Sequence, residues 1–470
     1  MSHPTAIDMN NDQNLLIVGI GASAGGLKAL QQLFETIPSD LPIAYFIIQH
    51  LDPNHKSLLS ELISKKTPLT VADATTNTTI QKGHVYVIPP GKYLEIKNNK
   101  INLVDKKEMS GSRMAIDHFF KSIAYHCEER CVGIVLSGSG SDGTAGLREI
   151  KAVGGLTLAQ MPQSADHPSM PNSAIDAGAI DKVAELDEIP KIIKNYLTHP
   201  LTLKKENQIQ RSFSNDVLDK VAKILSEHEK FYLSQYKPNT IYRRLTRRMS
   251  LTGIEDYEQY IKELEKNAEE RKQLSEDLLI NVTDFFRDKE AYQTLNEEVI
   301  PEIIKNIEKD QPIRIWIAGC ASGEEAYSLA ICFLEQMAKE NINNELQIFA
   351  TDIDDNAIKI ARKGIYPASI IKEVPPQYIQ KYFVKKEHDF YQIKGIVRDL
   401  ISFAKQNVAT NPPFSHMHLI SCRNLLIYMR KEIQEKILNA FYFALERDSY
   451  LFLGSSETIS NKTDFFRSIS

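Results

Sequence analysis

Two parts of the chain show short apolar runs that alternate with helical patterns, and a stretch that is helical throughout separates them. In the first part, strands are expected at 15–19, 43–48, 85–88, 132–136 and 156–159, and helices at 25–36 and 112–126. In the last part, strands are expected at 313–318, 347–350 and 418–421, and a helix at 324–339. Strands that alternate with helices are typical of parallel sheets with helices on both faces. The pattern therefore predicts two α/β domains.

The middle stretch, residues 214–279, is strongly charged, and Gly253 is its only glycine. A polar segment without periodicity, which includes Pro200, precedes it and is expected to be a linker. We therefore predict an N-terminal doubly wound α/β domain over 1–198, a linker over 199–213, a small all-helical domain over 214–290 and a C-terminal Rossmann-like domain over 291–470.

The composition is that of an ordinary soluble protein, with 42% hydrophobic and 25% charged residues. A net charge of −5 does not favour wholesale binding to nucleic acid or to membranes, and no apolar run approaches the ~20 residues of a membrane helix. Five scattered cysteines are typical of a reduced compartment, so a cytoplasmic protein is expected. Cys127 and Cys131 lie beside His126, but no second cluster completes a tetrahedral site, so no metal is predicted.

The first strand runs into a turn of small residues, Gly21-Ala22-Ser23-Ala24-Gly25-Gly26. Two interpretations compete for this turn. A dinucleotide-binding loop would require an acidic residue at the end of the second strand to hold a ribose. A nucleophile elbow would project a serine hydroxyl from the end of the first strand. The second strand is followed by His50, which suits a general base and favours the elbow.

A serine hydrolase also needs an acid that orients the histidine, and Asp142 follows another expected strand. The carboxyl ends of parallel strands meet at one edge of the sheet, so Ser23, His50 and Asp142 are expected to gather there. The alternative is that Ser23 only caps a helix.

These segments, together with residues 170–175, resemble CheB, the protein-glutamate methylesterase of bacterial chemotaxis, over about residues 14–196. The resemblance implies that Ser23 attacks a γ-methyl ester, that His50 is the base and that Asp142 orients it. It also implies oxyanion donors at the amides of Ala24 and Ser139. Ala24 replaces the family's usual threonine, and only a short polar segment precedes the first strand, so control by a receiver domain within the chain is not expected.

A second strand, loop and helix at residues 313–329 lacks the phosphate-loop pattern. Glu324 and Glu325 begin the helix and would repel phosphate, but they could pair with an ammonium or sulfonium group. Asp352 ends the next strand and suits a ribose diol. A nucleoside that carries a cationic tail and no phosphate is S-adenosyl-L-methionine.

This region, together with residues 281–288 and 421–428, resembles CheR, the chemoreceptor glutamate methyltransferase, from about residue 214 onward. The resemblance implies that Arg287 and Tyr428 lie closest to the transferred methyl group. It also implies a cofactor pocket lined by Asn281, Thr283, Arg287, Gly319, Glu325, Asp352, Asn407, Val408, Arg423 and Asn424. Phe285, Phe286 and Tyr428 could instead be ordinary core aromatics.

The helical stretch carries Arg243, Arg244, Arg247 and Arg248, which form two i,i+4 pairs. Such a charged run is usually a solvated face. The resemblance favours docking to the acidic helices of methyl-accepting chemoreceptors, with RNA binding as an outside alternative. Between 361 and 408 the family carries a small β-subdomain, and the absence of glycine in 385–389 predicts no tether to a receptor's C-terminal peptide.

The expected strand at 450–453 is not followed by a recognisable antiparallel partner. This predicts that the chain is an excerpt of a longer fusion, with sensory or kinase modules beyond residue 470. The expected function is a bifunctional enzyme that removes and adds glutamate methyl esters on chemoreceptors. A non-catalytic signalling scaffold and a nucleotide-binding oxidoreductase are the alternatives, and the latter would need an acidic residue in place of His50.

Overall fold

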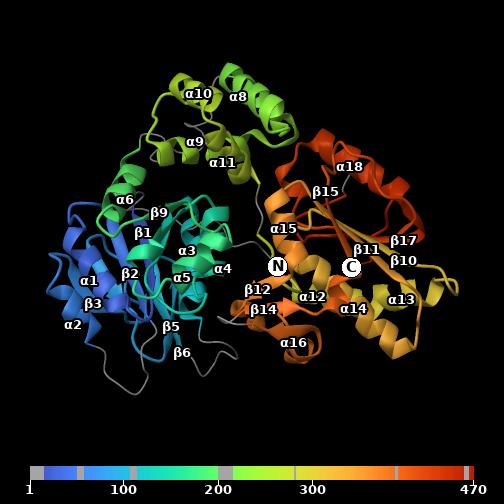
Figure 1. Cartoon of the computed structure of the whole chain (residues 1–470), viewed down its shortest axis with the longest axis horizontal. Helices are drawn as coiled ribbons and strands as arrows, with labels where there is room; N and C mark the ends of the chain where they lie inside the picture. The colour runs from blue at the N-terminus through green and yellow to red at the C-terminus, as the bar shows by residue number, and fades with distance from the viewer. Residues whose placement is uncertain are drawn as a thin grey trace.

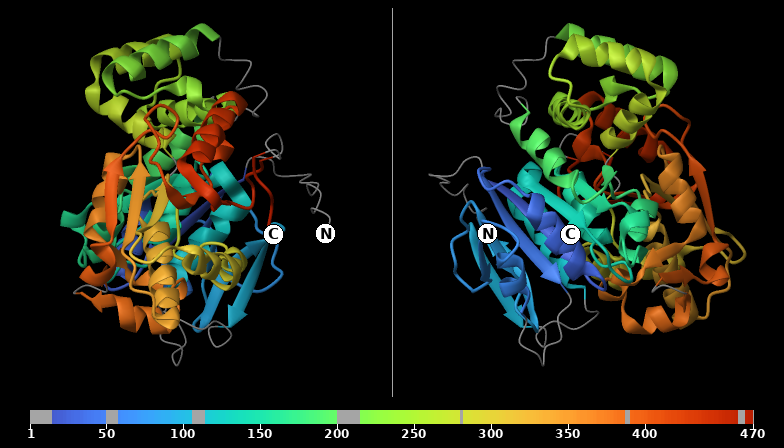
Figure 2. Two further views of the ribbon diagram at one scale, coloured as in Figure 1. Left: turned by 90° about the vertical axis from the view of Figure 1, so that its right-hand side faces the viewer. Right: turned by 60° about the vertical axis from the view of Figure 1, so that its left-hand side comes forward.

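The computed structural model describes residues 15–49, 58–105, 114–199, 215–279, 282–386, 390–459 and 465–469. Figure 1 shows an N-terminal α/β domain, coloured blue to teal, beside a C-terminal α/β domain, coloured yellow to red. A helical domain, coloured green, lies across the top of both, and the turned views of Figure 2 keep this arrangement. In the described part of the chain, no helix is long and apolar enough to cross a membrane.

The N-terminal domain is built on a seven-stranded sheet whose described strand pairs are all parallel. In spatial order its strands are β3 (Thr70–Asp73), β4 (His84–Val87), β2 (Ile43–Gln49), β1 (Leu16–Ala22), β7 (Cys131–Val135), β8 (Leu156–Gln160) and β9 (Lys182–Ala184). The central strand β1 is buried along its whole length, which is why its sequence is a continuous apolar run. An antiparallel hairpin of β5 (Lys92–Lys97) and β6 (Lys100–Asp105) lies outside this sheet.

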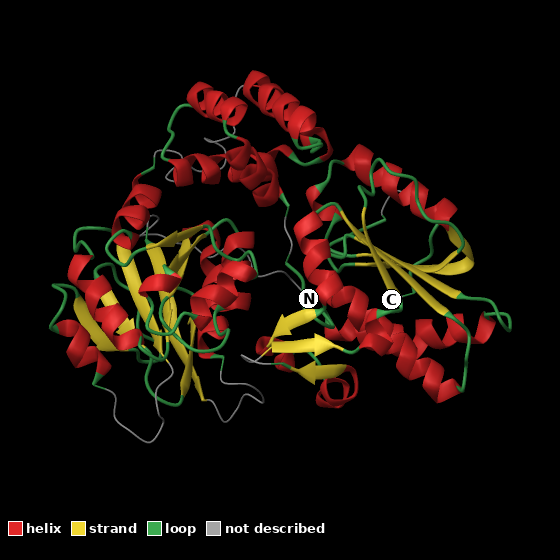
Figure 3. Ribbon diagram, viewed as in Figure 1, coloured by secondary structure: helices red, strands yellow, loops and turns green. Residues whose placement is uncertain are grey.

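Helices cover both faces of the N-terminal sheet (Figure 3). One apolar cluster contains residues of α1 (Gly26–Thr36), α2 (Leu59–Ser64) and α6 (Ile189–Thr198). The other contains residues of α3 (Ala115–Cys127), α4 (Thr144–Ala152) and α5 (Ser169–Asp176). This is the doubly wound architecture that the strand–helix alternation predicts.

The helical domain consists of α8 (Asn215–His228), α9 (Pro238–Thr252), α10 (Tyr257–Lys266) and α11 (Ala268–Leu278). Its apolar residues form a core of their own, with Leu225, Met249 and Leu274 fully buried. Leu251 of α9 packs against the core of the N-terminal domain, and the imidazole of His199 lies 3.1 Å from the carbonyl oxygen of Ile254. The helical domain is therefore packed onto its N-terminal neighbour.

The C-terminal domain contains a five-stranded sheet that is parallel throughout its described strands. Its spatial order is β15 (Ile401–Lys405), β11 (Leu346–Asp352), β10 (Ile313–Ala318), β16 (Met417–Cys422) and β17 (Leu445–Leu453). The helices of this domain include α12 (Lys289–Thr294), α13 (Ile300–Asn306), α14 (Glu324–Glu340), α15 (Asp355–Lys363) and α18 (Lys431–Ala444). The predicted fold class, two α/β units with an all-helical unit between them, is confirmed.

A small antiparallel sheet stands apart from the C-terminal sheet, on the side that faces the N-terminal domain (Figure 3). It contains β12 (Ile365–Pro367), β14 (Phe390–Ile393) and β13 (Phe383–Lys385), with α16 (Pro376–Tyr382) beside them. Part of the loop on which the absence of a receptor tether was predicted, residues 387–389, lies outside the described residues. Among the described residues after β17 there is no further strand.

Candidate functional sites

Ser23 lies at the carboxyl edge of the N-terminal sheet, directly after β1. Strand β2 ends at the same level, because Gln49 pairs with Ala22. The amide of Ser23 donates to the carbonyl oxygen of Ser137 at 3.0 Å, which joins this turn to the loop that follows β7. His50, the predicted base, lies outside the described residues.

The loop after β7 approaches Ser23 closely because its first glycine has no side chain. A Cβ atom added at Gly138 would lie 3.0 Å from the Cβ atom of Ser23 and 2.1 Å from Sδ of Met170. Helix α5 holds the loop from the other side, because the amide of Met170 donates to the Gly138 carbonyl at 3.0 Å and the Ser173 hydroxyl to the Gly140 carbonyl at 3.2 Å. The turn that presents Ser23 and the loop that leads to Asp142 are therefore one packed unit.

Asp142 is 4% exposed, and its carboxylate accepts hydrogen bonds from two backbone amides in the first turn of α3. Ile116 donates to one oxygen at 3.0 Å, and Asp117 donates to the other at 2.9 Å. These contacts fix the orientation of the carboxylate. The role of Asp142 in a catalytic triad stays a prediction.

Asp117 is a second buried carboxyl group beside Asp142, and the sequence pattern gave no sign of it. One of its oxygens accepts the amide of Gly146 at 2.8 Å, whereas the other has no hydrogen-bond partner among the described residues. Burial, and secondarily the charge of Asp142, raise the pKa of Asp117 to about 7.

Asp117→Asn is expected to remove a loss of stability that the wild type shows as the pH rises. The folded-state pKa of Asp117 lies above the unfolded value, so its contribution is fully present below about pH 4 and is lost as the pH rises through about 7. Between pH 5 and pH 8, the melting temperature should therefore fall less for the variant than for the wild type. Asp176→Asn, which changes an exposed carboxylate, is the control. An unchanged pH dependence in Asp117→Asn would contradict the burial argument.

The loop between β10 and α14 meets the carboxyl end of β11. The amides of Gly319 and Cys320 both donate to the carbonyl of Thr351, and the amide of Ala321 donates to Asp352 Oδ2 at 2.8 Å. Burial raises the pKa of Asp352 to about 6. A Cβ atom at Gly319, whose φ is 81°, would lie 2.9 Å from a side-chain carbon of Leu425. Glycine at this position therefore allows both the positive φ and the close approach of the loop to Leu425, which follows β16.

Glu325 and Arg423 form the polar centre of the C-terminal site. One oxygen of Glu325 accepts the Ser421 hydroxyl at 2.5 Å, and the other lies 3.6 Å from Arg423 Nη1. Arg423 also donates to the backbone oxygen of Arg287 at 2.9 Å and to Asp288 at 2.6 Å. The structure thus brings together three of the predicted residues, Arg287, Glu325 and Arg423.

The guanidinium of Arg423 is buried, with 1% of the side chain exposed, and it lies over the ring of Phe452 at 4.6 Å. Its Nε and Nη1 atoms have no hydrogen-bond partner within the described part of the chain. Burial raises the pKa of Glu325. A buried cation with free N–H groups next to a carboxylate is suited to bind a small zwitterion, because unpaired buried donors are costly.

Glu457 organises the loop that carries Arg423 and Asn424, and it was not among the predicted site residues. Its carboxylate accepts four backbone amides between 2.7 and 2.9 Å, from Asn424, Leu425, Leu426 and Gly454. Asn424 itself has a φ of 58°. The sequence offered no spacing rule for this contact, because the two segments are more than 30 residues apart.

The other predicted residues contact different parts of the molecule. Thr283 lines a pocket beside α4, and the amide nitrogen of the Asn407 side chain donates to Gln235 of the helical domain at 3.2 Å. Val408 packs against the apolar cluster of Trp316, and Tyr428 packs against the core of the helical domain. Asn281 lies outside the described residues.

Phe285 and Phe286, for which a core role was the alternative, are 2% and 7% exposed and belong to the core of the C-terminal domain. Their segment also carries Thr283, which lines a pocket with α4, and Arg287, whose backbone oxygen accepts from Arg423.

The polar side chains of this site fit S-adenosylmethionine. Glu325 could bind an ammonium group, and the free N–H groups of Arg423 could bind a carboxylate. Asp352 could accept hydrogen bonds from the hydroxyls of a ribose. No helix N-terminus cradles phosphate here, because Glu324 and Glu325 occupy the first turn of α14. The cofactor roles of the individual residues stay predictions.

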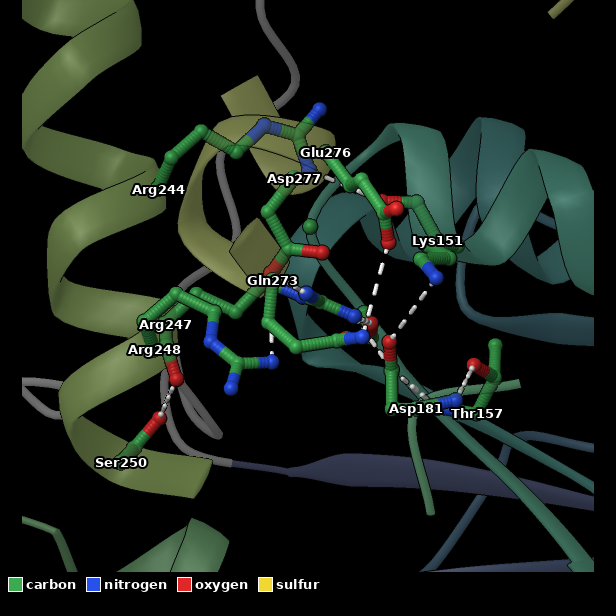
Figure 4. Close-up of polar contacts among 12 residues, drawn as sticks. Lys151, Thr157, Asp181, Arg244, Arg247, Arg248, Ser250, Gln273, Glu276 and Asp277 are labelled. Carbon is green, nitrogen blue, oxygen red and sulfur yellow. Dashed lines mark hydrogen bonds and ion pairs between the residues drawn. The ribbon is translucent and has the colours of Figure 1, made fainter. Parts of the chain in front are cut away.

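Three of the four arginines of α9 bind the N-terminal domain, and Arg248 pairs with Glu270 of α11, which differs from the solvated face that is usual for such a run. Arg244, Arg247 and Arg248 are 6%, 4% and 7% exposed. Figure 4 shows Arg247 next to Asp181, and Arg247 pairs with both Asp181 of the N-terminal domain and Asp277 of α11. Burial among these carboxylates leaves little free basic surface, and receptor docking through the arginines stays a prediction.

Comparison with protein families assigns each domain. Residues 18–193 match the CheB methylesterase family, residues 216–279 match the all-alpha domain of CheR methyltransferases, and residues 281–470 match the CheR SAM-binding domain. The predicted family, its enzyme classes and its cofactor are thereby confirmed.

Individual relatives show the same division. A chemotaxis protein methyltransferase of Borreliella burgdorferi is 34% identical over 53% of this chain and 90% of its own length. A protein-glutamate methylesterase/protein-glutamine glutaminase of Photorhabdus laumondii is 34% identical over 37% of this chain and 51% of its own length. An uncharacterized 104.1 kDa protein of Rhodobacter capsulatus is 32% identical over 88% of this chain. The chain spans only 45% of that relative's length.

Proposed function

This chain belongs to the family of chemotaxis protein methyltransferases and carries a CheB methylesterase domain ahead of the transferase, and on that premise we propose that it both removes and adds methyl groups on chemoreceptor glutamates. The observation that carries the proposal is that a different set of polar side chains lies at the carboxyl edge of each of the two parallel sheets. The first set contains Ser23 and Asp142, and the second contains Glu325, Asp352 and Arg423.

In the esterase domain, Ser23 Oγ would attack the carbonyl carbon of a glutamate γ-methyl ester, while His50 takes the serine proton. The ester C–O bond breaks, and methanol leaves with that proton. Water then hydrolyses the acyl-serine and yields a glutamate carboxylate. The amides of Ala24 and Ser139 would stabilise the oxyanion.

In the transferase domain, S-adenosylmethionine would supply an activated methyl group on its sulfonium. The protein's own task is then alignment, because a glutamate carboxylate is already a nucleophile. Glu325 and Arg423 would hold the amino-acid end of the cofactor, and Asp352 would hold its ribose. Arg287 and Tyr428 would face the acceptor glutamate. The Glu457 carboxylate keeps the loop of Arg423 and Asn424 in place.

Both activities should be detectable on one substrate. A receptor fragment incubated with the protein and S-adenosylmethionine labelled in the methyl group should gain label on glutamate. When the free methyl donor is then removed, the label should be released as methanol. A fragment whose acceptor glutamates are changed to aspartate should gain none. Failure to label any glutamate, with S-adenosylmethionine bound, would reject the transferase assignment.

A further inference from the structure

Helix α4 of the esterase domain lines two pockets that it shares with the transferase domain. A cavity of about 140 Å³ lies between the domains, with Arg148 and Lys151 of α4 on one side and Ser322 and Asp354 of the transferase on the other. A neighbouring pocket is lined by Glu149 of α4 together with residues of the transferase that include Thr283 and Glu324. Figure 1 shows α4, the helix that follows the Asp142 loop, at the edge of the esterase domain that faces the transferase, and Arg148 on this helix lies next to Ser322 and Glu324, beside the loop at which the methyl donor is proposed to bind.

Ion pairs hold this contact. Arg148 Nη1 lies 3.6 Å from Glu324, and Lys121 Nζ of α3 lies 3.4 Å from Asp284 and 3.8 Å from Glu373. All three carboxylates belong to the transferase. Because Glu324 is 3% exposed, its pairing with Arg148 is shielded from water and salt more than a surface pair would be.

The contact also reaches the esterase site from the transferase side. Lys372 of the transferase donates to the carbonyl of Met114 at 3.3 Å and lies over the ring of Tyr93 at 5.6 Å. Met114 directly precedes α3, whose first amides bind Asp142. One interface therefore touches the surroundings of both proposed active sites.

The arginines of α9 complete the interface. Arg244 donates to the carbonyls of Lys151 and Ala152 at the C-terminal end of α4, where a helix carries partial negative charge. Arg243 pairs with Glu129 at 2.8 Å, and Arg247 pairs with Asp181 (Figure 4). These arginines thus bind carboxylates and the negative end of a helix on the esterase domain. An acidic helical protein would present the same features.

A helical substrate has no room in this arrangement. An α-helix with its side chains is about 10–12 Å across, whereas Arg148 and Glu149 of α4 line one pocket together with Thr283 and Glu324 of the transferase, and Arg148 Nη1 lies 3.6 Å from Glu324. A glutamate on a receptor helix therefore cannot approach the transferase site while α4 lies over it.

We propose that the esterase domain is a built-in competitor of the transferase's protein substrate: docked as in this structure, it closes the transferase, and an acidic helical substrate must displace it. This proposal rests on the proposed function, since it names what controls access to the same site. The transferase would then act on its protein substrate only while the esterase domain is displaced.

The test changes the esterase side of the interface and leaves both proposed sites untouched. In Lys121→Glu/Glu129→Lys, like charges replace three interdomain ion pairs, those of Lys121 with Asp284 and Glu373 and that of Glu129 with Arg243, without any change in net charge. The matched control is Glu35→Lys/Lys66→Glu, which swaps an exposed ion pair within the esterase domain. The full chain is used throughout, with small-angle scattering, carbodiimide cross-linking and methyl transfer as readouts.

In the wild type we expect a compact particle and a cross-link between Lys121 and Asp284 or Glu373. In the interface variant, the radius of gyration should rise, and methyl transfer to a receptor fragment should increase about fivefold. This factor corresponds to a shift of about 1 kcal/mol in the equilibrium between closed and open forms. The control should behave as the wild type does.

Addition of a coiled-coil receptor fragment gives a readout that does not depend on catalysis. The fragment should weaken the Lys121 cross-link of the wild type as it binds. The proposal is overturned if the fragment binds without loss of the cross-link, or if the interface variant opens without faster methyl transfer where the wild type methylates. If no protein methylates and the fragment still displaces the cross-link, the proposed function fails and the competition stands.

Discussion

Ser23→Ala is expected to lower methanol release from a methylated receptor fragment by roughly 10⁴-fold or more, because removal of a serine nucleophile abolishes the covalent route. The loss should appear in kcat rather than in substrate binding, since the hydroxyl is small and the turn is held by backbone contacts. Those contacts include the hydrogen bond from the Ser23 amide to Ser137, which alanine keeps.

Two controls separate chemistry from folding. Ser164→Ala removes another esterase hydroxyl, which donates to the carbonyl of Met161, and should leave methanol release unchanged. Methyl transfer by Ser23→Ala itself should also persist, because the transferase site lies in a different domain. If Ser23→Ala retains methanol release within tenfold of the wild type, Ser23 is not the nucleophile.

Glu325→Gln is expected to weaken the binding of S-adenosylmethionine by about 10- to 100-fold. A hydrogen bond to a charged group contributes about 1.5–3 kcal/mol, and the glutamine keeps the size of the side chain but not its charge. Calorimetry at neutral pH measures the change directly. The fold should survive, because burial already disfavours the charged form of Glu325.

The pH dependence provides a second check on Glu325. Burial raises its pKa, so a falling pH protonates it sooner than an exposed glutamate, and the affinity of the wild type should fall with it. Glu325→Gln should lack that component. Glu335→Gln, on the same helix and paired with Lys381 at the surface, should bind the cofactor as the wild type does. An affinity equal to the wild type's in Glu325→Gln would show that this carboxylate does not contact the cationic end.

The sequence by itself determined the fold class and the family. The central strands of both sheets are buried on both faces, so their apolar runs were visible without any tertiary information, as in β1 and β10. The turns after these strands carry small residues at fixed spacing, which is why Ser23 and Gly319 could be picked out. Short edge strands such as β3 and β9, and the hairpin of β5 and β6, were not predicted, because their half-exposed residues show little periodicity.

Only the tertiary structure decided which side chains meet. Glu457 binds the amides of the Asn424 loop, and Asp117 lies beside Asp142, although long stretches of chain separate the partners. The arginines of α9 have the spacing of a solvated face, yet three of them are buried: Arg244 and Arg247 bind the esterase domain, and Arg248 pairs with Glu270 inside the helical domain. Periodicity specifies which face of an element is apolar, whereas contacts between distant segments depend on how domains pack, and no local pattern in the sequence encodes that packing.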